Sequence, residues 1–156
     1  MMHDATLLSV AAAGVFVLML AALSWVDIKQ GLLPDALTLS LMWAGLLINS
    51  QVVFTSTADS IYGAAVGYGL LWTANQIYRW RAGHDGMGYG DFKLMAALGA
   101  WLGVEAVPWV LIGACGLGAL AALVCRCRGA AIERVLPFGP FLSVGGVTAL
   151  VWVFSG

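Results

Sequence analysis

Two aspartates are the residues in this 156-residue sequence best suited to chemistry. Asp27 ends the string Ser-Trp-Val-Asp at the close of a long apolar stretch, and Asp91 ends the string Gly-Met-Gly-Tyr-Gly-Asp just before another. Two carboxylates that lie close together cannot both ionise cheaply, so one keeps its proton while the other acts as a general base on water. Such a pair hydrolyses a peptide bond without a metal, a cofactor or a nucleophilic side chain.

Each aspartate also has an ordinary structural interpretation. Asp27 alone fits an interfacial residue beside water, and Asp91 alone fits an N-cap that accepts the unpaired amides of a first helical turn. The glycines before Asp91 would allow its backbone a positive φ and a tight approach to another segment. Because the chain has few other polar side chains, the two acids together predict a catalytic pair.

The elements that must position this pair are membrane helices. The chain is 62% apolar and 10% charged, against roughly 45–50% and 25% in soluble domains, and a soluble fold of this size cannot bury so much apolar surface. A spanning helix needs about 20 mostly apolar residues, which predicts spans at 5–26, 36–54, 60–78, 92–104, 108–125 and 136–155. We therefore expect an all-α polytopic protein whose residues 1–156 form a single transmembrane domain, with the short fourth span tilted, partly buried or extended by the preceding loop.

The basic residues give the orientation of these spans. With six spans, the segments 27–35, 79–91 and 126–135 lie on one side, and every basic residue falls there or within one turn of it: Lys29, Arg79, Arg81, Lys93, Arg126, Arg128 and Arg134. The opposite side holds Asp4, Asp59 and Glu105. Short loops rich in Lys and Arg stay in the cytoplasm, so both termini face outward and Asp27 and Asp91 lie at the cytoplasmic edge, where ionisable groups are functional candidates.

Smaller features complete the list of candidates. Asp35 follows Pro34 and fits the N-cap of the second span, or a contact with substrate. Lys93 can hold Asp91 ionised or extend to the lipid headgroups. The loop 83–90 is expected to be mobile because its glycines supply little packing, and its amides from Gly88 to Asp91 are candidate donors to a reaction intermediate.

Other site types are not predicted. A net charge of −1 gives no electrostatic footprint for nucleic acid. The three cysteines lack the paired CxxC pattern of a zinc site, and His84 with Asp85 lacks further ligands at suitable spacing, so we expect no metal and no cofactor. The glycine pairs 63/67 and 99/103 predict close helix packing.

Three regions carry a resemblance to a known family. The chain from Asp27 through Leu-Pro-Asp-Ala-Leu-Thr-Leu at 33–39 resembles the first catalytic-aspartate region of bacterial type IV prepilin peptidases. Residues 88–103 resemble the GxGD region of that family over its whole length, and Pro-Phe-Gly-Pro-Phe at 137–141 resembles the motif that opens its last helix. The similarity covers most of residues 20–155. It implies a six-helix intramembrane aspartyl endopeptidase of the bacterial inner membrane, with Asp27 and Asp91 as the catalytic pair.

The resemblance also implies a substrate. The family cuts the short basic leader from prepilins and pseudopilins, just before their apolar N-terminal helix, and Asp35, Gly88, Gly90 and Lys93 would line the active-site loop or bind substrate. Pilus, secretion and DNA-uptake systems all stay open, as does the oligomeric state. Longer members carry an N-terminal extension with paired cysteines that is associated with N-methylation. We find no counterpart here and expect the protease core alone, without methyltransferase activity. A methylated product in an N-methylation assay would contradict this expectation.

Two other classes of function compete with the peptidase. A small proton-coupled transporter also uses paired membrane carboxylates, but it predicts acids near the bilayer midplane and an inverted repeat, which the sequence does not display. A non-catalytic membrane assembly factor would tolerate the loss of either Asp27 or Asp91, whereas a protease would not.

Overall fold

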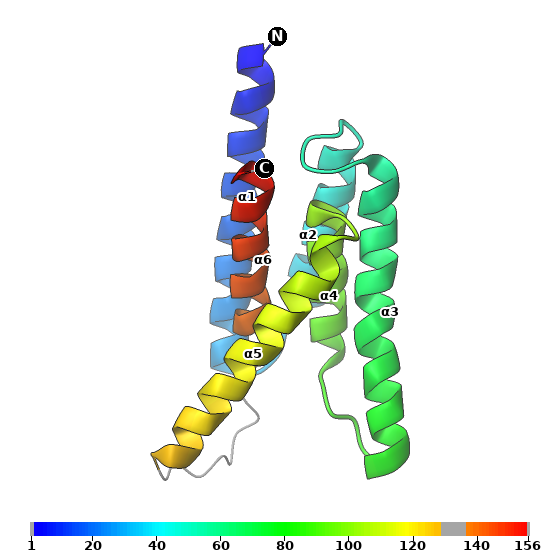
Figure 1. The fold of residues 1–156 in the computed structure, drawn as a ribbon, viewed down its shortest axis with the longest axis vertical. Helices are drawn as coiled ribbons and strands as arrows, with labels where there is room; N and C mark the ends of the chain where they lie inside the picture. The colour runs from blue at the N-terminus through cyan, green and yellow to red at the C-terminus, as the bar shows by residue number, and fades with distance from the viewer. Residues whose placement is uncertain (1, 129–136, 156) are drawn as a thin grey trace.

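The computed structural model describes residues 2–128 and 137–155, with side chains described for 6–128 and 137–154. These parts form a bundle of helices, most of which run roughly along one another while α5 crosses at an angle (Figure 1), which confirms the predicted all-α membrane fold. The helices are α1 (Met2–Gln30), α2 (Asp35–Asn49), α3 (Thr57–Ala82), α4 (Tyr89–Leu102), α5 (Ala106–Cys127) and α6 (Gly139–Ser155). Arg134 and the predicted start of the sixth span at residue 136 lie outside the described residues.

Several helix boundaries differ from the prediction. The second span was expected to run to residue 54, but α2 ends at Asn49, because the buried Asn49 side chain organises the turn that follows. Its Oδ1 accepts hydrogen bonds from the backbone amides of Phe54 at 3.0 Å and Thr55 at 3.4 Å. Helix α3 continues to Ala82 beyond the expected residue 78, and α4 begins at Tyr89 rather than at residue 92.

The short helix α4 is the core of the bundle. Eleven of its fourteen residues are buried, and it packs against α2, α3, α5 and α6. Trp101 is fully buried, and its indole Nε1 donates a 2.7 Å hydrogen bond to the carbonyl oxygen of Leu41 in α2. The expectation that the fourth helix is partly buried is therefore confirmed, and α4 gives its neighbours a common packing surface.

Glycines let α3 and α4 approach closely. A Cβ atom added at Gly63 would clash with the backbone of Gly99, and one added at Gly67 would lie 2.7 Å from the carbonyl oxygen of Met95. Gly103 ends α4 with a φ of +84°, and its backbone also lies against Gly63. The predicted glycine packing is thus confirmed for the α3–α4 pair, where a larger side chain would separate the two helices.

The outer surface has the character expected of a lipid-facing protein. Helix α1 from Thr6 to Gln30 and α5 are long and apolar enough to cross a membrane, and α2 and α6 are shorter apolar helices. Large apolar side chains such as Leu18, Trp43 and Leu120 are mostly exposed. The C-terminal ends of α1, α3 and α5, where the described basic residues cluster, lie at one end of the bundle (Figure 1).

Candidate active site

Asp27 lies in the last turn of α1 and is only 6% exposed. Its Oδ2 accepts a 3.0 Å hydrogen bond from the backbone amide of Gly139, the first residue of α6 and 112 positions away in sequence. A Cβ atom at position 139 would lie 2.6 Å from this same oxygen. The contact between α1 and α6 at the site therefore requires glycine.

Asp91 is the third residue of α4 and is 9% exposed. The backbone of Gly88 lies beside its carboxyl group, since a Cβ atom added at Gly88 would be 3.8 Å from Oδ2 of Asp91, and the Asp91 amide donates to the Gly88 carbonyl oxygen at 3.2 Å. The expectation that Asp91 is an N-cap is wrong, because α4 begins two residues earlier and its N-cap is Gly88. Asp91 instead stays inside the first turn, where its carboxyl group is held by the backbone before it.

The glycines before Asp91 act by their small size rather than by their backbone freedom. The expectation of positive φ there is wrong, since the described glycines with positive φ are Gly31, Gly83 and Gly103. The expectation of a tight approach is confirmed at Gly90, where an added Cβ atom would lie 2.7 Å from Cβ of Leu33. Gly90 thus lets the start of α4 pack against the connection between α1 and α2.

The structure brings the two predicted acids together. Asp27 and Asp91 are the only buried acidic residues in the described part of the chain, and their carboxyl groups are close enough to interact electrostatically. Like charges at this separation disfavour the doubly ionised pair. In such a pair one carboxyl group stays protonated while the other ionises, as general acid–base chemistry on water requires.

Asp35 and Lys93 form an ion pair beside this site. Lys93 Nζ lies 2.6 Å from Oδ1 of Asp35, which joins the start of α2 to the first turns of α4. The expectation that Asp35 is an N-cap is wrong, because Pro34 holds that position and Asp35 is already helical. Lys93 therefore has Asp35 as its partner, an acid that the prediction did not consider beside Asp91 and the lipid headgroups.

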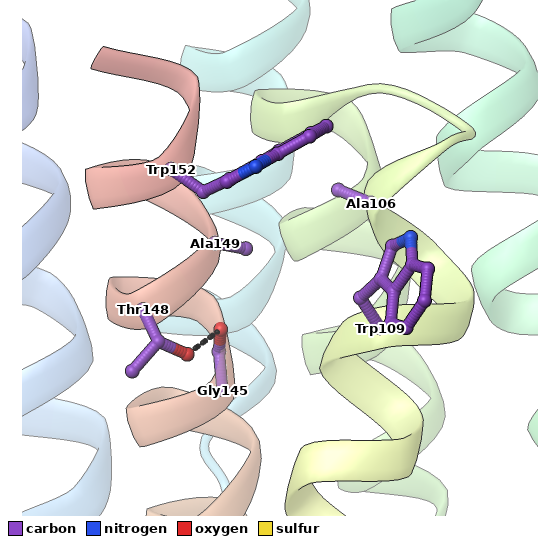
Figure 2. Close-up of a pocket in the computed structure, with 6 residues that line it drawn as sticks. All are labelled: Ala106, Trp109, Gly145, Thr148, Ala149 and Trp152. Atoms are coloured by element: carbon purple, nitrogen blue, oxygen red, sulfur yellow. Dashed lines mark hydrogen bonds between the residues drawn. The ribbon is translucent and has the colours of Figure 1, made fainter. Parts of the chain in front are cut away.

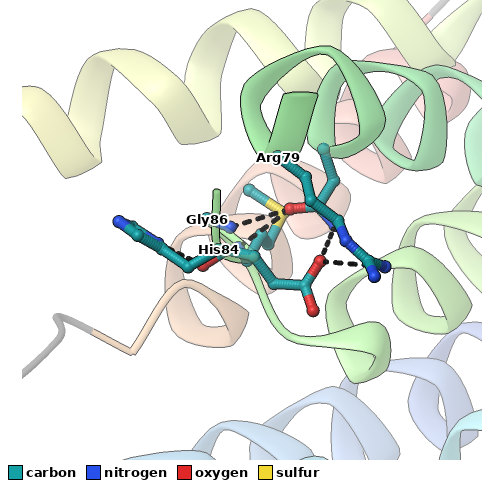
Figure 3. A network of polar contacts seen from close by, with 6 residues as sticks. Arg79, His84 and Gly86 are labelled. Carbon is teal, nitrogen blue, oxygen red and sulfur yellow. Dashed lines mark hydrogen bonds and ion pairs between the residues drawn. The ribbon is translucent and has the colours of Figure 1, made fainter. Parts of the chain in front are cut away.

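Asn75 in α3 is a polar residue of the site that the sequence interpretation missed. Its Oδ1 accepts hydrogen bonds from the amides of Gly86 at 2.9 Å and Met87 at 3.2 Å, and its Nδ2 donates to Oδ1 of Asp85 at 3.0 Å. Figure 3 draws this network, which ties the loop before α4 to α3. The available signal was the helical spacing of a buried stripe along α3, made of Ser60, Gly63, Gly67, Leu71 and Asn75.

A separate cavity lies away from the two acids. It has a volume of about 350 Å³ and opens between the start of α5 and the later turns of α6 (Figure 2). Its lining is almost entirely apolar and consists of Ala106, Trp109, Gly145, Thr148, Ala149 and Trp152. Asp27 meets α6 at the other end, at Gly139, so this cavity contributes no group to the acid pair. Within the described residues no group of three or more His, Cys, Asp or Glu is arranged to hold a metal ion.

Comparison with known proteins agrees with this geometry. Residues 14–123 match the model of the type IV leader peptidase family. The chain is 48% identical over 132 residues to a prepilin leader peptidase/N-methyltransferase of Burkholderia pseudomallei, covering 84% of this chain and 43% of the relative. It is 45% identical over 134 residues to the protein of the same name from Aeromonas hydrophila, covering 85% of this chain and 46% of that relative.

These relatives are longer than the part that matches. A third relative of the same name, from Stutzerimonas stutzeri, is 43% identical over 134 residues, which cover 85% of this chain and 46% of the relative. The chain therefore spans less than half the length of the curated relatives that it matches. No solved structure matches it. The family match covers most of the helical bundle and contains both buried aspartates, so the chain belongs to the type IV leader peptidase family.

Proposed function

We propose that this chain is an intramembrane aspartic endopeptidase that removes the leader peptide from type IV prepilins or pseudopilins, in a single transmembrane domain. The observation that carries the proposal is the burial of Asp27 from α1 and Asp91 from α4 within electrostatic reach of each other, in a largely apolar bundle of this family. The relatives are named as prepilin leader peptidases. A peptide substrate suits the site, because two carboxyl groups that share a proton are sufficient to hydrolyse an amide.

The proposed reaction uses the pair as one acid–base unit. The deprotonated carboxylate takes a proton from a water molecule, and the resulting hydroxide attacks the carbonyl carbon of the scissile bond. The protonated partner polarises the carbonyl oxygen and then protonates the leaving amine. Because coupled carboxyl groups titrate as a pair, neither role belongs to one aspartate alone. The backbone amides near Gly88 and Gly90 are the candidate donors to the tetrahedral intermediate.

The proposed setting is the bacterial inner membrane, with several spans and with the basic ends of α1, α3 and α5 in the cytoplasm. Both ends of this chain then face the outer side. The support is that Lys29, Arg79, Arg81, Arg126 and Arg128 share one end of the bundle, and positive loops are retained in the cytoplasm. In this orientation the apolar helix of the substrate packs laterally in the membrane, while its leader peptide stays in water beside Asp27 and Asp91.

The test is cleavage of a detergent-solubilised prepilin by the purified chain and by Asp27→Asn and Asp91→Asn. Each change keeps the size of the side chain but removes the proton that the reaction needs, so both variants should fold and lose activity by at least about 10³-fold. Asp59→Asn is the matched control, because Asp59 lies in the first turn of α3, away from the pair. Normal cleavage by either folded variant would exclude the catalytic pair and favour the assembly factor or the transporter.

A further inference from the structure

The loop between α3 and α4 leads directly into the proposed site. It comprises residues 83–88 and contains Gly83, Gly86 and Gly88. Glycine loses more conformational freedom on folding than any other residue, so a loop of this composition holds one shape only when other groups fix it. Gly88, its last residue, lies beside the carboxyl group of Asp91, and its carbonyl oxygen accepts a 3.2 Å hydrogen bond from the Asp91 amide. The shape of this loop therefore bears on where Asp91 points.

The buried side chain of Asn75 supplies the fixing contacts. Its Oδ1 accepts from two successive amides, those of Gly86 and Met87, and its Nδ2 reaches the carboxylate of Asp85. Asn75 is only 6% exposed, so water competes poorly for these bonds. Three consecutive loop residues are thus held by one side chain that lies about two turns before the end of the preceding helix.

Neighbouring contacts support this anchor without replacing it. The ring of Tyr78 lies so close to Gly86 that an added Cβ atom would be 2.7 Å from Cδ1 of the ring. Arg79 approaches Asp85 at 3.9 Å, but both side chains are about half exposed, at 54% and 43%. An exposed ion pair at this distance contributes little. The hydrogen bonds that the backbone amides of Gly86 and Met87 donate to Asn75 are therefore the main polar restraint on the loop (Figure 3).

We propose that Asn75 is a positioning residue for the catalytic pair. It fixes Gly86 and Met87, which places Gly88 against Asp91 and aims the Asp91 carboxyl group at Asp27. The proposal rests on the proposed peptidase function, and it assigns Asn75 no contact with substrate. A displacement of about 1 Å at a reacting group is able to reduce a rate by about 100-fold, so a misplaced loop should reduce kcat more than it changes KM.

The first experiment compares Asn75→Ala with Gln76→Ala in the prepilin cleavage assay. Both remove a carboxamide from the same turn of α3, and among the described residues Gln76 makes none of the side-chain contacts that hold the loop. Asn75→Ala should lower kcat by about 10- to 100-fold with KM changed less than threefold, and Gln76→Ala should leave both constants near wild type. A folded Asn75→Ala variant with kcat within twofold of wild type would overturn the proposal.

A reciprocal exchange tests the hydrogen bonds themselves. Asn75→Asp keeps the acceptor for the two amides but removes the donor and faces Asp85 with a second negative charge. Asp85→Asn keeps an acceptor for Asn75 and should be mild. The double variant Asn75→Asp with Asp85→Asn restores a donor–acceptor pair in the opposite direction, so it should regain at least fivefold of the kcat lost in Asn75→Asp. No recovery would overturn the assigned contact between positions 75 and 85.

Amide exchange separates this proposal from the proposed function. Hydrogen–deuterium exchange of the detergent-solubilised chain should reveal protected amides at Gly86 and Met87 in wild type and faster exchange, by at least tenfold, in Asn75→Ala. Equal exchange in the two proteins would refute the anchor. A wild-type chain that cleaves no prepilin would count against the peptidase alone, because the exchange experiment needs no substrate.

Discussion

At the residue scale, the described part of the chain buries few polar side chains and leaves none of their buried nitrogen or oxygen atoms without a hydrogen-bond partner. A buried carboxyl group is costly unless hydrogen bonds compensate for the lost water. The carboxyl group of Asp27 accepts a hydrogen bond from the amide of Gly139, and the backbone of Gly88 lies beside the carboxyl group of Asp91. Asp35 and Lys93 pair with each other in a more exposed position. Asp27 and Asp91, the acids proposed to react, therefore differ from Asp35, whose charge is balanced by Lys93.

The pH dependence of cleavage follows from the shared proton. At low pH both Asp27 and Asp91 are protonated and no general base remains, whereas at high pH both are ionised and the general acid is lost. Prepilin cleavage should therefore follow a bell-shaped profile, which is checked by measuring kcat/KM from about pH 4 to pH 10. Circular dichroism at each pH controls for unfolding. A flat profile over this range would count against a carboxyl pair.

Gly139→Ala tests the contact between α6 and Asp27. The new methyl group would lie 2.6 Å from Oδ2 of Asp27, so the carboxyl group has to move and loses its amide partner. We expect kcat to fall by about tenfold or more, because a misplaced general base is inefficient. Gly116→Ala is the control, since nothing lies within 4 Å of a Cβ atom there. Equal activity of the two variants would show that the contact is dispensable.

The ion pair of Asp35 and Lys93 suggests how the protein binds the basic residues of a leader peptide. The Asp35 side chain is 63% exposed beside the site, and its charge can be shared between Lys93 and a basic residue of the leader. Asp35→Asn should raise KM severalfold for a prepilin with its native basic leader and have little effect when the leader's basic residues are replaced by Gln. The ratio of the two KM changes is the measurement. A KM change of the same size for both substrates would remove Asp35 from leader binding.

At the element scale, the short helix α4 carries an acid at one end and is buried along nearly its whole length. It packs closely against α3, because glycines on the two helices let their backbones touch. Helix α6 supplies its first amide to the same site. The first turns of α4 and α6 thus lie at the proposed site, where the positive partial charge of each helix N-terminus favours a carboxylate.

Gly63→Ala should separate α3 from α4. The added methyl group clashes with the backbone of Gly99, which cannot rotate away as a side chain would, and overpacking of this kind costs about 1–3 kcal/mol. Gly69→Ala lies on the same helix with nothing within 4 Å of its Cβ position and should be neutral or slightly stabilising. Thermal unfolding in one detergent compares the two, and equal midpoints would contradict the importance of this contact.

At the scale of the whole molecule, the alternating directions of the helices bring the described basic residues to one end of the bundle. The connection between α2 and α3 lies at the opposite end of the bundle from the loop between α3 and α4 (Figure 1). The described basic residues gather at the second of these ends. This asymmetry supports the proposed orientation with the basic end in the cytoplasm, which would put the acid pair where a leader peptide is accessible.

Cysteine labelling tests this orientation. In a variant whose native cysteines are replaced by serine, Gln51→Cys and His84→Cys each introduce one thiol at an exposed position. A membrane-impermeant maleimide added to spheroplasts should label Gln51→Cys only, and labelling of inverted membrane vesicles should give the opposite result. Labelling of both positions from one side would contradict the proposed topology.

The sequence by itself determined the class of the protein and singled out Asp27 and Asp91 as its candidate reactive residues. Long apolar segments must be helical in a membrane, because backbone groups there have only each other as partners, and acids are rare enough in such a chain for Asp27 and Asp91 to stand out. The helix ends were less predictable. Asn49 ends α2 early and Asp91 lies inside a helix rather than at its cap, because side-chain contacts across the bundle outweigh local propensity at these positions.

Only the tertiary structure decided which groups meet. The partner of Asp27 lies 112 positions away at Gly139, and the partner of Lys93 lies 58 positions away at Asp35. In the sequence, Asn75 is simply one polar residue within a helix. Its hydrogen bonds to the loop before α4 can be identified only from the folded structure. Helix formation depends on local hydrophobicity, whereas these contacts depend on the packing of whole helices against α4, which local sequence does not encode.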